Sequence, residues 1–143
     1  MTMDSQQRHI LIVDDEPLVH ESIQYLLEGL GYVIDHAKNG YEALAIFEHE
    51  PEKFHMVFTD YVMPEMRGDK LAAAIKRLSP KQPVVMITAF PEKLTSSACP
   101  LGGIESFICK PFDRQMLQTA LTRYGRATAP QPQVIEDENR QCG

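Results

Sequence analysis

The chain has 143 residues, the length of a single domain that can bury roughly two-thirds of its unfolded surface. Its formal charge of −6, with no basic stripe, argues against direct binding to nucleic acid, which requires clustered Lys and Arg. No apolar run approaches the roughly 20 residues that span a bilayer, and residues 1–9 lack the apolar core of a signal peptide. We therefore expect a cytoplasmic domain with no membrane segment.

Cysteine and histidine give no sign of a disulfide framework or a zinc site. The three cysteines are odd in number and lack paired short spacing, so we expect reduced thiols. The five histidines show no metal-ligand spacing, and most of them are assigned to the surface.

The first predicted element is a strand, ILIV at residues 10–13, which runs into three acidic residues. A helix should follow, because Pro17 suits a first helical turn and Gly29 and Gly31 supply an end. The expected apolar face of this helix consists of Leu18, Ile23, Leu26, Leu27 and Leu30.

The next two strands differ in character. VIDHA at 33–37 is polar enough for a sheet edge, whereas MVF at 56–58 is apolar. A helix is predicted between them at about 40–50, with an apolar face of Ala43, Leu44 and Phe47.

A third helix is predicted over 69–79, with Asp69 as its N-cap and Pro80 just beyond its end. Its expected apolar face is Leu71, Ala74, Ile75 and Leu78. A strand, VVMI at 84–87, follows.

The segment 91–106 predicts only a short or irregular fourth helix, because Pro100 followed by Leu-Gly-Gly interrupts helical structure. FIC at 107–109 predicts the fifth strand. The last helix is predicted over 113–124 with Asp113 as its N-cap. Its apolar side should be Met116, Leu117, Ala120, Leu121 and Tyr124.

Alternating strands and helices predict an α/β fold in which right-handed crossovers join parallel strands and helices cover both faces of the sheet. We assign residues 8–125 to this one domain. Residues 1–7 are expected to be flexible, and 126–143, which lack apolar periodicity and contain Pro, Gln and acidic residues, are expected to be a disordered tail.

Chemistry-bearing residues collect where the predicted strands end. In an open parallel sheet, ligands bind beyond the carboxyl ends of the strands. Five residues are predicted to meet on that rim: Asp14, Asp15, Asp60, Thr88 and Lys110.

Three clustered carboxylates repel one another, so a divalent cation is expected among them. Oxygen ligands favour Mg²⁺, and a carboxylate beside it can act as a nucleophile toward phosphorus. Lys110 would offset charge on the phosphoryl oxygens, and the Thr88 hydroxyl would donate a hydrogen bond to one of them. Taken singly, each residue has a plainer explanation: a helix cap for Asp14 or Asp15, packing for Thr88 and a solvated charge for Lys110.

The motifs ILIVDDEP, NGYEAL, VFTDYVMPEMRG, VVMITA and FICKPF resemble, as a set, the receiver domains of bacterial two-component response regulators. The resemblance covers about residues 8–124 and implies a flavodoxin-like (βα)5 sheet with strand order 2-1-3-4-5.

The resemblance also implies roles at the predicted site. Asp60 would be the phosphoacceptor, Asp15 a direct Mg²⁺ ligand, Asp14 a supporting acid acting through water, and the Val62 backbone carbonyl a further ligand. The remaining assignments are Thr88 as the switch hydroxyl, Lys110 as the phosphate-binding lysine and Phe107 as the switch aromatic residue.

The implied function is acceptance of a phosphoryl group on Asp60 from the phosphohistidine of a sensor histidine kinase or a histidine phosphotransfer protein. A change at the surface of the fourth helix, fifth strand and fifth helix would then alter contact with a downstream effector protein. Such a domain is a phosphoacceptor switch, not an enzyme that turns over a substrate.

Two departures from the family pattern bear on this expectation. The segment SSACPLGG replaces an alanine-rich fourth helix, which weakens the case for a homodimer through that face. Val62 and Phe90 stand where the family controls water access to the acyl phosphate. Either these apolar side chains slow self-dephosphorylation, because neither can orient an attacking water, or both simply pack.

Three other readings stay open. A Mg²⁺-dependent phosphohydrolase would also use an aspartyl nucleophile, but that class carries it at the end of the first strand as DxDx[TV], which ILIVDDEP does not match. The fold could instead serve as an interaction module that works without phosphate. The chain could also be a fragment of a hybrid histidine kinase or of a larger regulator; no helix-turn-helix pattern is present in it.

Overall fold

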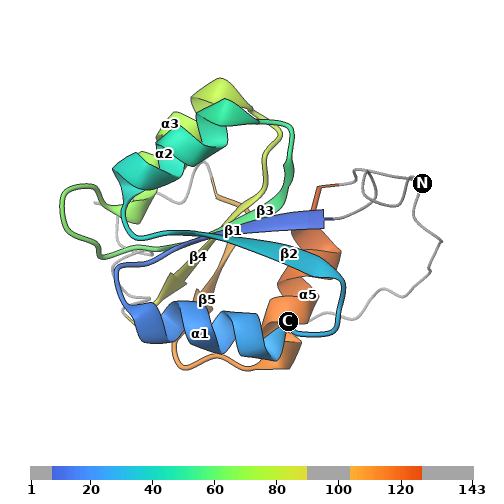
Figure 1. Cartoon of the computed structure of the whole chain (residues 1–143). Helices are drawn as coiled ribbons and strands as arrows, with labels where there is room; N and C mark the ends of the chain where they lie inside the picture. The colour runs from blue at the N-terminus through green and yellow to red at the C-terminus, as the bar shows by residue number, and fades with distance from the viewer. Residues whose placement is uncertain (1–7, 90–103, 127–143) are drawn as a thin grey trace.

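The sheet is the centre of the molecule (Figure 1). The computed structural model describes residues 8–89 and 104–126, and the five strands in these ranges pair in parallel in the order β2-β1-β3-β4-β5. The strands are β1 (Arg8–Val13), β2 (Tyr32–Ala37), β3 (Phe54–Asp60), β4 (Val84–Thr88) and β5 (Ser106–Cys109). This order confirms the predicted flavodoxin-like fold.

Helices cover both faces of this sheet, as alternation of strand and helix requires. Figure 1 shows α1 and α5 on one face and α2 and α3 on the other. The helices are α1 (Pro17–Leu26), α2 (Gly40–His49), α3 (Gly68–Leu78) and α5 (Arg114–Tyr124).

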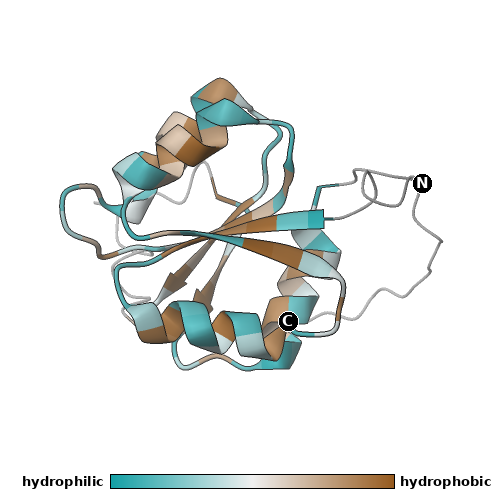
Figure 2. Ribbon diagram, viewed as in Figure 1, coloured by the Kyte–Doolittle hydropathy of each residue, from teal (hydrophilic) through white to brown (hydrophobic). Residues whose placement is uncertain are grey.

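Two apolar clusters hold the layers together, one on each face. The alternating side chains of β1 divide between them: Ile10 and Ile12 pack toward α1 and α5, whereas Leu11 and Val13 pack toward α2 and α3. The central strand β3 is buried along its whole length, including its last residue, Asp60. Figure 2 shows hydrophobic colour along the strands and alternating colour around the helices. The core therefore extends to the strand end that carries a charge.

The predicted apolar face of α1 is wrong at its two ends. Leu18 is 73% exposed and Leu30 is 38% exposed, whereas Ile23 and Leu27 are buried. Leu18 lies in the first turn, beyond the edge of the face that meets the sheet, and Leu30 follows the helix. The glycine stop is confirmed, because Gly29 and Gly31 have φ angles of 85° and 89°.

The start of α3 also differs from the prediction. Asp69 lies within the first turn and is not the N-cap; Arg67 occupies that position, and no side chain caps the helix there. The Asp69 carboxylate instead accepts two hydrogen bonds from the Arg67 guanidinium, at 3.0 and 2.9 Å. At the other end, Leu78 is 48% exposed, while Ala72 is buried in its place.

The predicted cap of α5 is confirmed. Asp113 accepts a hydrogen bond from the Met116 backbone N–H at 2.9 Å. At its other end this helix is fixed to β3, because Arg126 donates its backbone N–H to the His55 carbonyl and the His55 ring contacts the Arg126 carbonyl at 2.7 Å.

Some predictions fall outside the described residues. These are the flexible segment 1–7, the irregular fourth helix except for its last residues, Phe90, and the tail beyond Arg126. Within the described residues, no helix has the length and apolar character needed to cross a membrane.

Candidate functional site

Three carboxylates gather where two neighbouring central strands end. Asp14 and Asp15 follow β1, and Asp60 is the last residue of β3, which pairs with β1 up to Val13 and Thr59. One oxygen from each carboxylate lies within 4.8 Å of the others. Asp14 and Asp60 are buried, whereas Asp15 is exposed. The predicted acidic cluster is therefore assembled by strand pairing.

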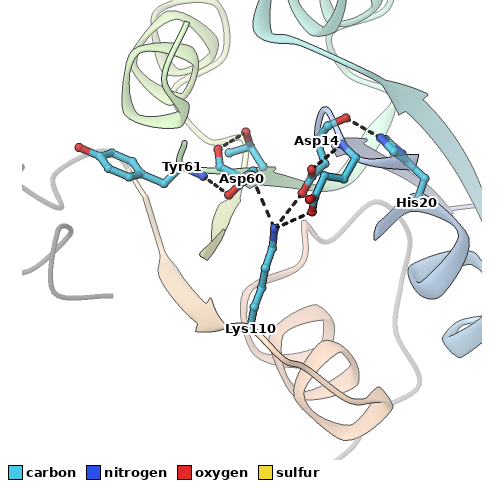
Figure 3. A network of polar contacts seen from close by, with 7 residues as sticks. Asp14, His20, Asp60, Tyr61 and Lys110 are labelled. Carbon is cyan, nitrogen blue, oxygen red and sulfur yellow. Dashed lines mark hydrogen bonds and ion pairs between the residues drawn. The ribbon is translucent and has the colours of Figure 1, made fainter. Parts of the chain in front are cut away.

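Lys110 reaches the same cluster from the end of β5. Its Nζ lies 3.3 Å from Asp14 Oδ2, 3.6 Å from Asp60 Oδ2 and 3.9 Å from Glu16 Oε1 (Figure 3). Burial lowers the pKa of Lys110, but Asp14 and Asp60 more than offset this, so its pKa is raised overall. The lysine is therefore a fixed positive charge at the rim.

Electrostatic conflict remains despite this lysine. Burial and the neighbouring Asp14 raise the pKa of Asp60 from 3.8 to about 6, although Lys110 and the backbone N–H groups of Tyr61 and Val62 act in the opposite direction. Burial also raises the pKa of Asp14, with a smaller contribution from Asp15. The positive charge of one ammonium does not balance the negative charge of three carboxylates, so a further cation would stabilise the cluster.

The donor set fits Mg²⁺. The carboxylate oxygens are hard ligands, and an exposed Asp15 beside two buried carboxylates leaves one side of the cluster open to water. Mg²⁺ commonly takes one or two carboxylates and keeps several waters. The acidic pocket of this chain is therefore compatible with Mg²⁺.

The backbone fixes how the two buried carboxylates point. The Glu16 N–H donates to Asp14 Oδ1 at 2.9 Å, and the Tyr61 N–H donates to Asp60 Oδ1 at 2.8 Å. Each carboxylate thus has one oxygen engaged by the backbone. The other oxygen, Oδ2, is the one nearest to Lys110 in both cases.

The loop after Asp60 closes on itself directly behind the site. The Gly68 N–H donates to the Tyr61 carbonyl at 2.8 Å. A side-chain Cβ at Gly68 would collide with the Asp60 carbonyl oxygen and lie 2.7 Å from Met86 Sδ, so only glycine fits where α3 begins. The glycine in the sequence EMRG is therefore required by close approach to the strand that carries Asp60.

Thr88 and Phe107 lie on the two strands beyond β3. Thr88 ends β4 and is fully buried, and its carbonyl accepts a hydrogen bond from the Lys110 N–H at 2.8 Å. Phe107 pairs with Met86 across β4 and β5, is half-buried, and packs against the cluster of Tyr61 and Met86. The backbone of Thr88 is thereby hydrogen-bonded to the backbone of Lys110.

Val62 differs from the other predicted site residues in its exposure. Its side chain is 46% exposed, while its backbone N–H is one of the groups that lower the pKa of Asp60. The backbone at Val62 therefore adjoins the site while the side chain faces solvent.

His20 contacts the backbone of the site and is not among the predicted site residues. His20 Nε2 lies 2.8 Å from the Asp14 carbonyl oxygen and fixes the backbone of that residue from α1 (Figure 3). The contact joins residues six positions apart across a strand-to-helix turn, and no periodic pattern marks it. Only the turn of the chain after β1 brings the ring to this carbonyl.

Comparison with known proteins identifies the family. The model of the response regulator receiver domain matches residues 10–122. The transcriptional regulatory protein GlrR of Escherichia coli K12 is 32% identical over 90% of this chain, and the two-component response regulator ORR1 of Oryza sativa subsp. japonica is 40% identical over 76% of it. This chain spans 28% of the length of GlrR and 52% of the length of ORR1.

Solved structures agree with this match. A response regulator receiver domain from Clostridium thermocellum has a TM-score of 0.74 at 27% identity, with 82% of this chain and 93% of that chain covered. The response regulator TrrA from Thermotoga maritima, in complex with Mg²⁺ and BeF, also has a TM-score of 0.74 at 27% identity, with 82% and 98% covered. Their likeness extends to the whole sheet and its helices.

Proposed function

The chain belongs to the response regulator receiver family, and on that premise we propose that it is a phosphorylation-controlled switch with Asp60 as the phosphoacceptor. The observation that carries the proposal is the position of Asp60. It is a buried carboxylate at the end of the central strand, with its Oδ2 facing Lys110 at 3.6 Å and two further carboxylates alongside.

The proposed reaction is a phosphoryl transfer. An oxygen of the Asp60 carboxylate attacks the phosphorus of a phosphohistidine on a partner protein. The phosphorus–nitrogen bond of the donor breaks as the new phosphorus–oxygen bond forms, and the donor histidine leaves as a neutral imidazole when its other ring nitrogen carries a proton. The product is an aspartyl phosphate.

Lys110 and Thr88 would act on the transferring group. Lys110 already lies 3.6 Å from Asp60 Oδ2, so its ammonium can offset negative charge on the phosphoryl oxygens. The Thr88 hydroxyl would donate a hydrogen bond to one of these oxygens. Because the Lys110 N–H is bound to the Thr88 carbonyl, the two residues hold each other's backbone in place.

Mg²⁺ would be held by Asp15, Asp60 and the Val62 backbone carbonyl, with Asp14 contributing through water. The bound ion supplies charge compensation for the phosphoryl oxygens and for the three carboxylates. The structure of TrrA in complex with Mg²⁺ and BeF supports the choice of Mg²⁺ as the ion.

The switch would run from Thr88 to Phe107. Negative charge at Asp60 would draw the Thr88 hydroxyl toward it, and the half-buried Phe107 would turn inward from its place against Tyr61 and Met86. The surface around β5 and α5 would change with it. A downstream effector protein that binds only one of the two conformations of this surface would sense the phosphorylation state.

A groove beside the site offers a place for the phosphohistidine donor. Leu18 is 73% exposed and Tyr25 is 71% exposed, and both line a hollow of about 400 Å³ next to Lys110. A sensor histidine kinase or a histidine phosphotransfer protein seated there would bring its phosphohistidine to the rim that holds Asp60. The groove is lined by Leu18, Val19, Ser22, Tyr25, Leu26, Lys110, Pro111 and Phe112.

Phosphotransfer profiling tests the proposal. The chain is incubated with each phosphorylated histidine kinase of the source organism, and transfer of label is followed with time. We expect rapid transfer from one or a few kinases to the wild type and none to Asp60→Asn. Asp113→Asn is the matched control, because asparagine caps a helix as well as aspartate does and the variant leaves the site untouched.

The outcome that contradicts the switch is turnover. Continuous release of phosphate from small phosphate esters would assign the chain to the Mg²⁺-dependent phosphohydrolases. Failure of every kinase and of acetyl phosphate to label Asp60, together with failure to bind Mg²⁺ or beryllofluoride, would instead indicate an interaction module that works without phosphate.

A further inference from the structure

Two histidine rings face each other beside the acidic cluster. His20 lies on α1 and His36 lies on β2, and their Nδ1 atoms are 2.8 Å apart. The ring centroids are 4.8 Å apart at an interplanar angle of 64°, so the contact is made by the nitrogen edges and not by stacking.

The other nitrogen of each ring is bound to an oxygen. His20 Nε2 donates to the Asp14 carbonyl at 2.8 Å (Figure 3), and His36 Nε2 donates to Gln24 Oε1 at 3.1 Å. A carbonyl oxygen and an amide oxygen only accept hydrogen bonds, so each Nε2 must carry a proton. A neutral imidazole has one ring proton, and therefore both Nδ1 atoms present lone pairs to each other.

Two facing lone pairs at 2.8 Å repel each other, so either a proton on one Nδ1, which makes that ring an imidazolium, or a metal ion must lie between them. We propose that the Nδ1 atoms of His20 and His36 bind a divalent transition-metal ion of the zinc class. A metal-bound histidine typically donates its other ring N–H to an oxygen, which is the arrangement that both rings already have. Tetrahedral zinc with bonds of about 2.0–2.1 Å would place the two nitrogens roughly 3.3 Å apart, so the rings need to separate by only about 0.5 Å.

The surroundings of the pair supply room and negative charge. A hollow of about 450 Å³ opens beside it, and carboxylates of Asp15, Glu21 and Glu42 line that hollow together with one ammonium, Lys38. Waters in this hollow can complete the coordination, and the carboxylates that line it make the surroundings negative. Burial and the neighbouring His20 lower the pKa of His36, which favours the neutral ring that a metal requires.

This pair is distinct from the carboxylate cluster. The cluster consists of side-chain oxygens, which suit Mg²⁺, whereas the pair consists of imidazole nitrogens, which suit zinc. Asp14 takes part in both places but with different atoms, its carboxylate in the cluster and its backbone carbonyl at His20. A metal at the pair would join α1 to the edge strand β2 and hold the backbone from which the Asp14 carboxylate extends.

Calorimetric titration with Zn²⁺ tests the proposal on the full chain, with Mg²⁺ present at saturation to occupy the carboxylate cluster. We expect one Zn²⁺ per chain. Either His20→Ala or His36→Ala removes a ligand and should lower the affinity for Zn²⁺ by about tenfold or more. His49→Ala is the matched control, because it removes an exposed histidine at the end of α2 and should leave binding unchanged.

Two further measurements keep the result specific. A variant with Cys99→Ser, Cys109→Ser and Cys142→Ser should bind Zn²⁺ as the wild type does. Nitrogen-15 spectra of the histidine rings should show Nδ1 of both His20 and His36 shifting when Zn²⁺ is added to the wild type, which needs no variant to fold. Unshifted Nδ1 signals, unchanged binding by His36→Ala, or loss of binding in the cysteine variant would overturn the proposal.

Discussion

Asp60 is a carboxylate that the fold buries beside another carboxylate, and burial is the larger of the two causes that raise its pKa to about 6. The unfolded chain would ionise the same group near 3.8. In the metal-free protein, Asp60 therefore binds its proton more tightly in the folded state than in the unfolded state. Its contribution to stability is complete below about pH 4 and is lost as the pH rises through about 6.

Replacement of this carboxylate makes the effect measurable. Asp60→Asn removes the ionisation, so the variant should gain stability relative to the wild type as the pH rises from 4 to 7, by on the order of 3 kcal/mol. Urea unfolding in EDTA at a series of pH values measures the difference. A difference between variant and wild type that stays constant over this pH range would show that Asp60 ionises as it does in the unfolded chain.

Val62 leads to a prediction about the lifetime of the phosphate. Its side chain is apolar and half-exposed next to Asp60, so it cannot hold a water in position to attack an acyl phosphate. We expect the wild type to lose phosphate slowly in Mg²⁺ buffer, and Val62→Asn to lose it faster, because an amide can bind and orient water. Leu78→Asn, at an exposed position on α3, is the control, and a wild-type lifetime of seconds would contradict the prediction.

The residues of the site differ in how well the sequence reveals them. Asp14, Asp15, Asp60, Thr88 and Lys110 can be predicted, because each follows or ends an apolar run and parallel strands bring their carboxyl ends to one edge. The contact of His20 with the Asp14 carbonyl could not be predicted, since it depends on the exact turn between β1 and α1. The roles of the five predicted residues stay predictions.

At the scale of elements, two aspartates at helix starts, one of them a cap and the other not, allow the contribution of a cap to be measured. Asp113 accepts a backbone N–H at the start of α5, whereas Asp69 lies inside the first turn of α3 and pairs with the exposed Arg67 side chain. Asp113→Ala should therefore cost about 1 kcal/mol of unfolding free energy. Asp69→Ala should cost about half of that or less, because exposed ion pairs contribute little.

Denaturant unfolding of the two variants measures this comparison under one set of conditions. Both substitutions remove one carboxylate from an exposed helix start, so the difference between them isolates the cap. Equal losses of stability would mean that the backbone bond to Asp113 contributes nothing beyond charge, and a larger loss for Asp69→Ala would contradict the assignment of the α3 start.

The helices also show where pattern reasoning fails. Helical spacing alone places Leu18 and Leu78 on buried faces, yet both are exposed, and at the start of α1 the neighbouring Val19 packs against the core instead. The small residue Ala72 is buried instead, because α3 approaches β3 closely at Gly68. Which residues of a helix are buried depends on how the helix is rotated and how closely it approaches the sheet, and both are tertiary properties.

At the scale of the whole molecule, the strand order 2-1-3-4-5 brings the ends of β1, β3, β4 and β5 to one rim. Alternation of strand and helix predicted the layers, while the order of the strands came from the resemblance to a family. The boundaries 1–7 and 126–143, and the cytoplasmic location, stay predictions.

Metal binding at this rim should stabilise the whole fold, since an ion bound only by the folded state shifts unfolding by mass action. We expect millimolar Mg²⁺ to raise the thermal unfolding temperature of the wild type at pH 7.5, and to raise it much less in Asp15→Asn. His49→Ala serves as the control with wild-type behaviour. An equal rise in Asp15→Asn and wild type would place the ion elsewhere.

The central claim, that Asp60 is the phosphoacceptor, is tested most directly by intact-mass spectrometry after incubation with acetyl phosphate and Mg²⁺, followed by borohydride reduction and peptide mapping. The claim predicts one phosphoryl group per chain, its mapping to Asp60, and no modification of Asp60→Asn, while Asp113→Asn behaves as the wild type. A modified Asp60→Asn variant, or a wild type that stays unmodified while it binds Mg²⁺, would contradict it.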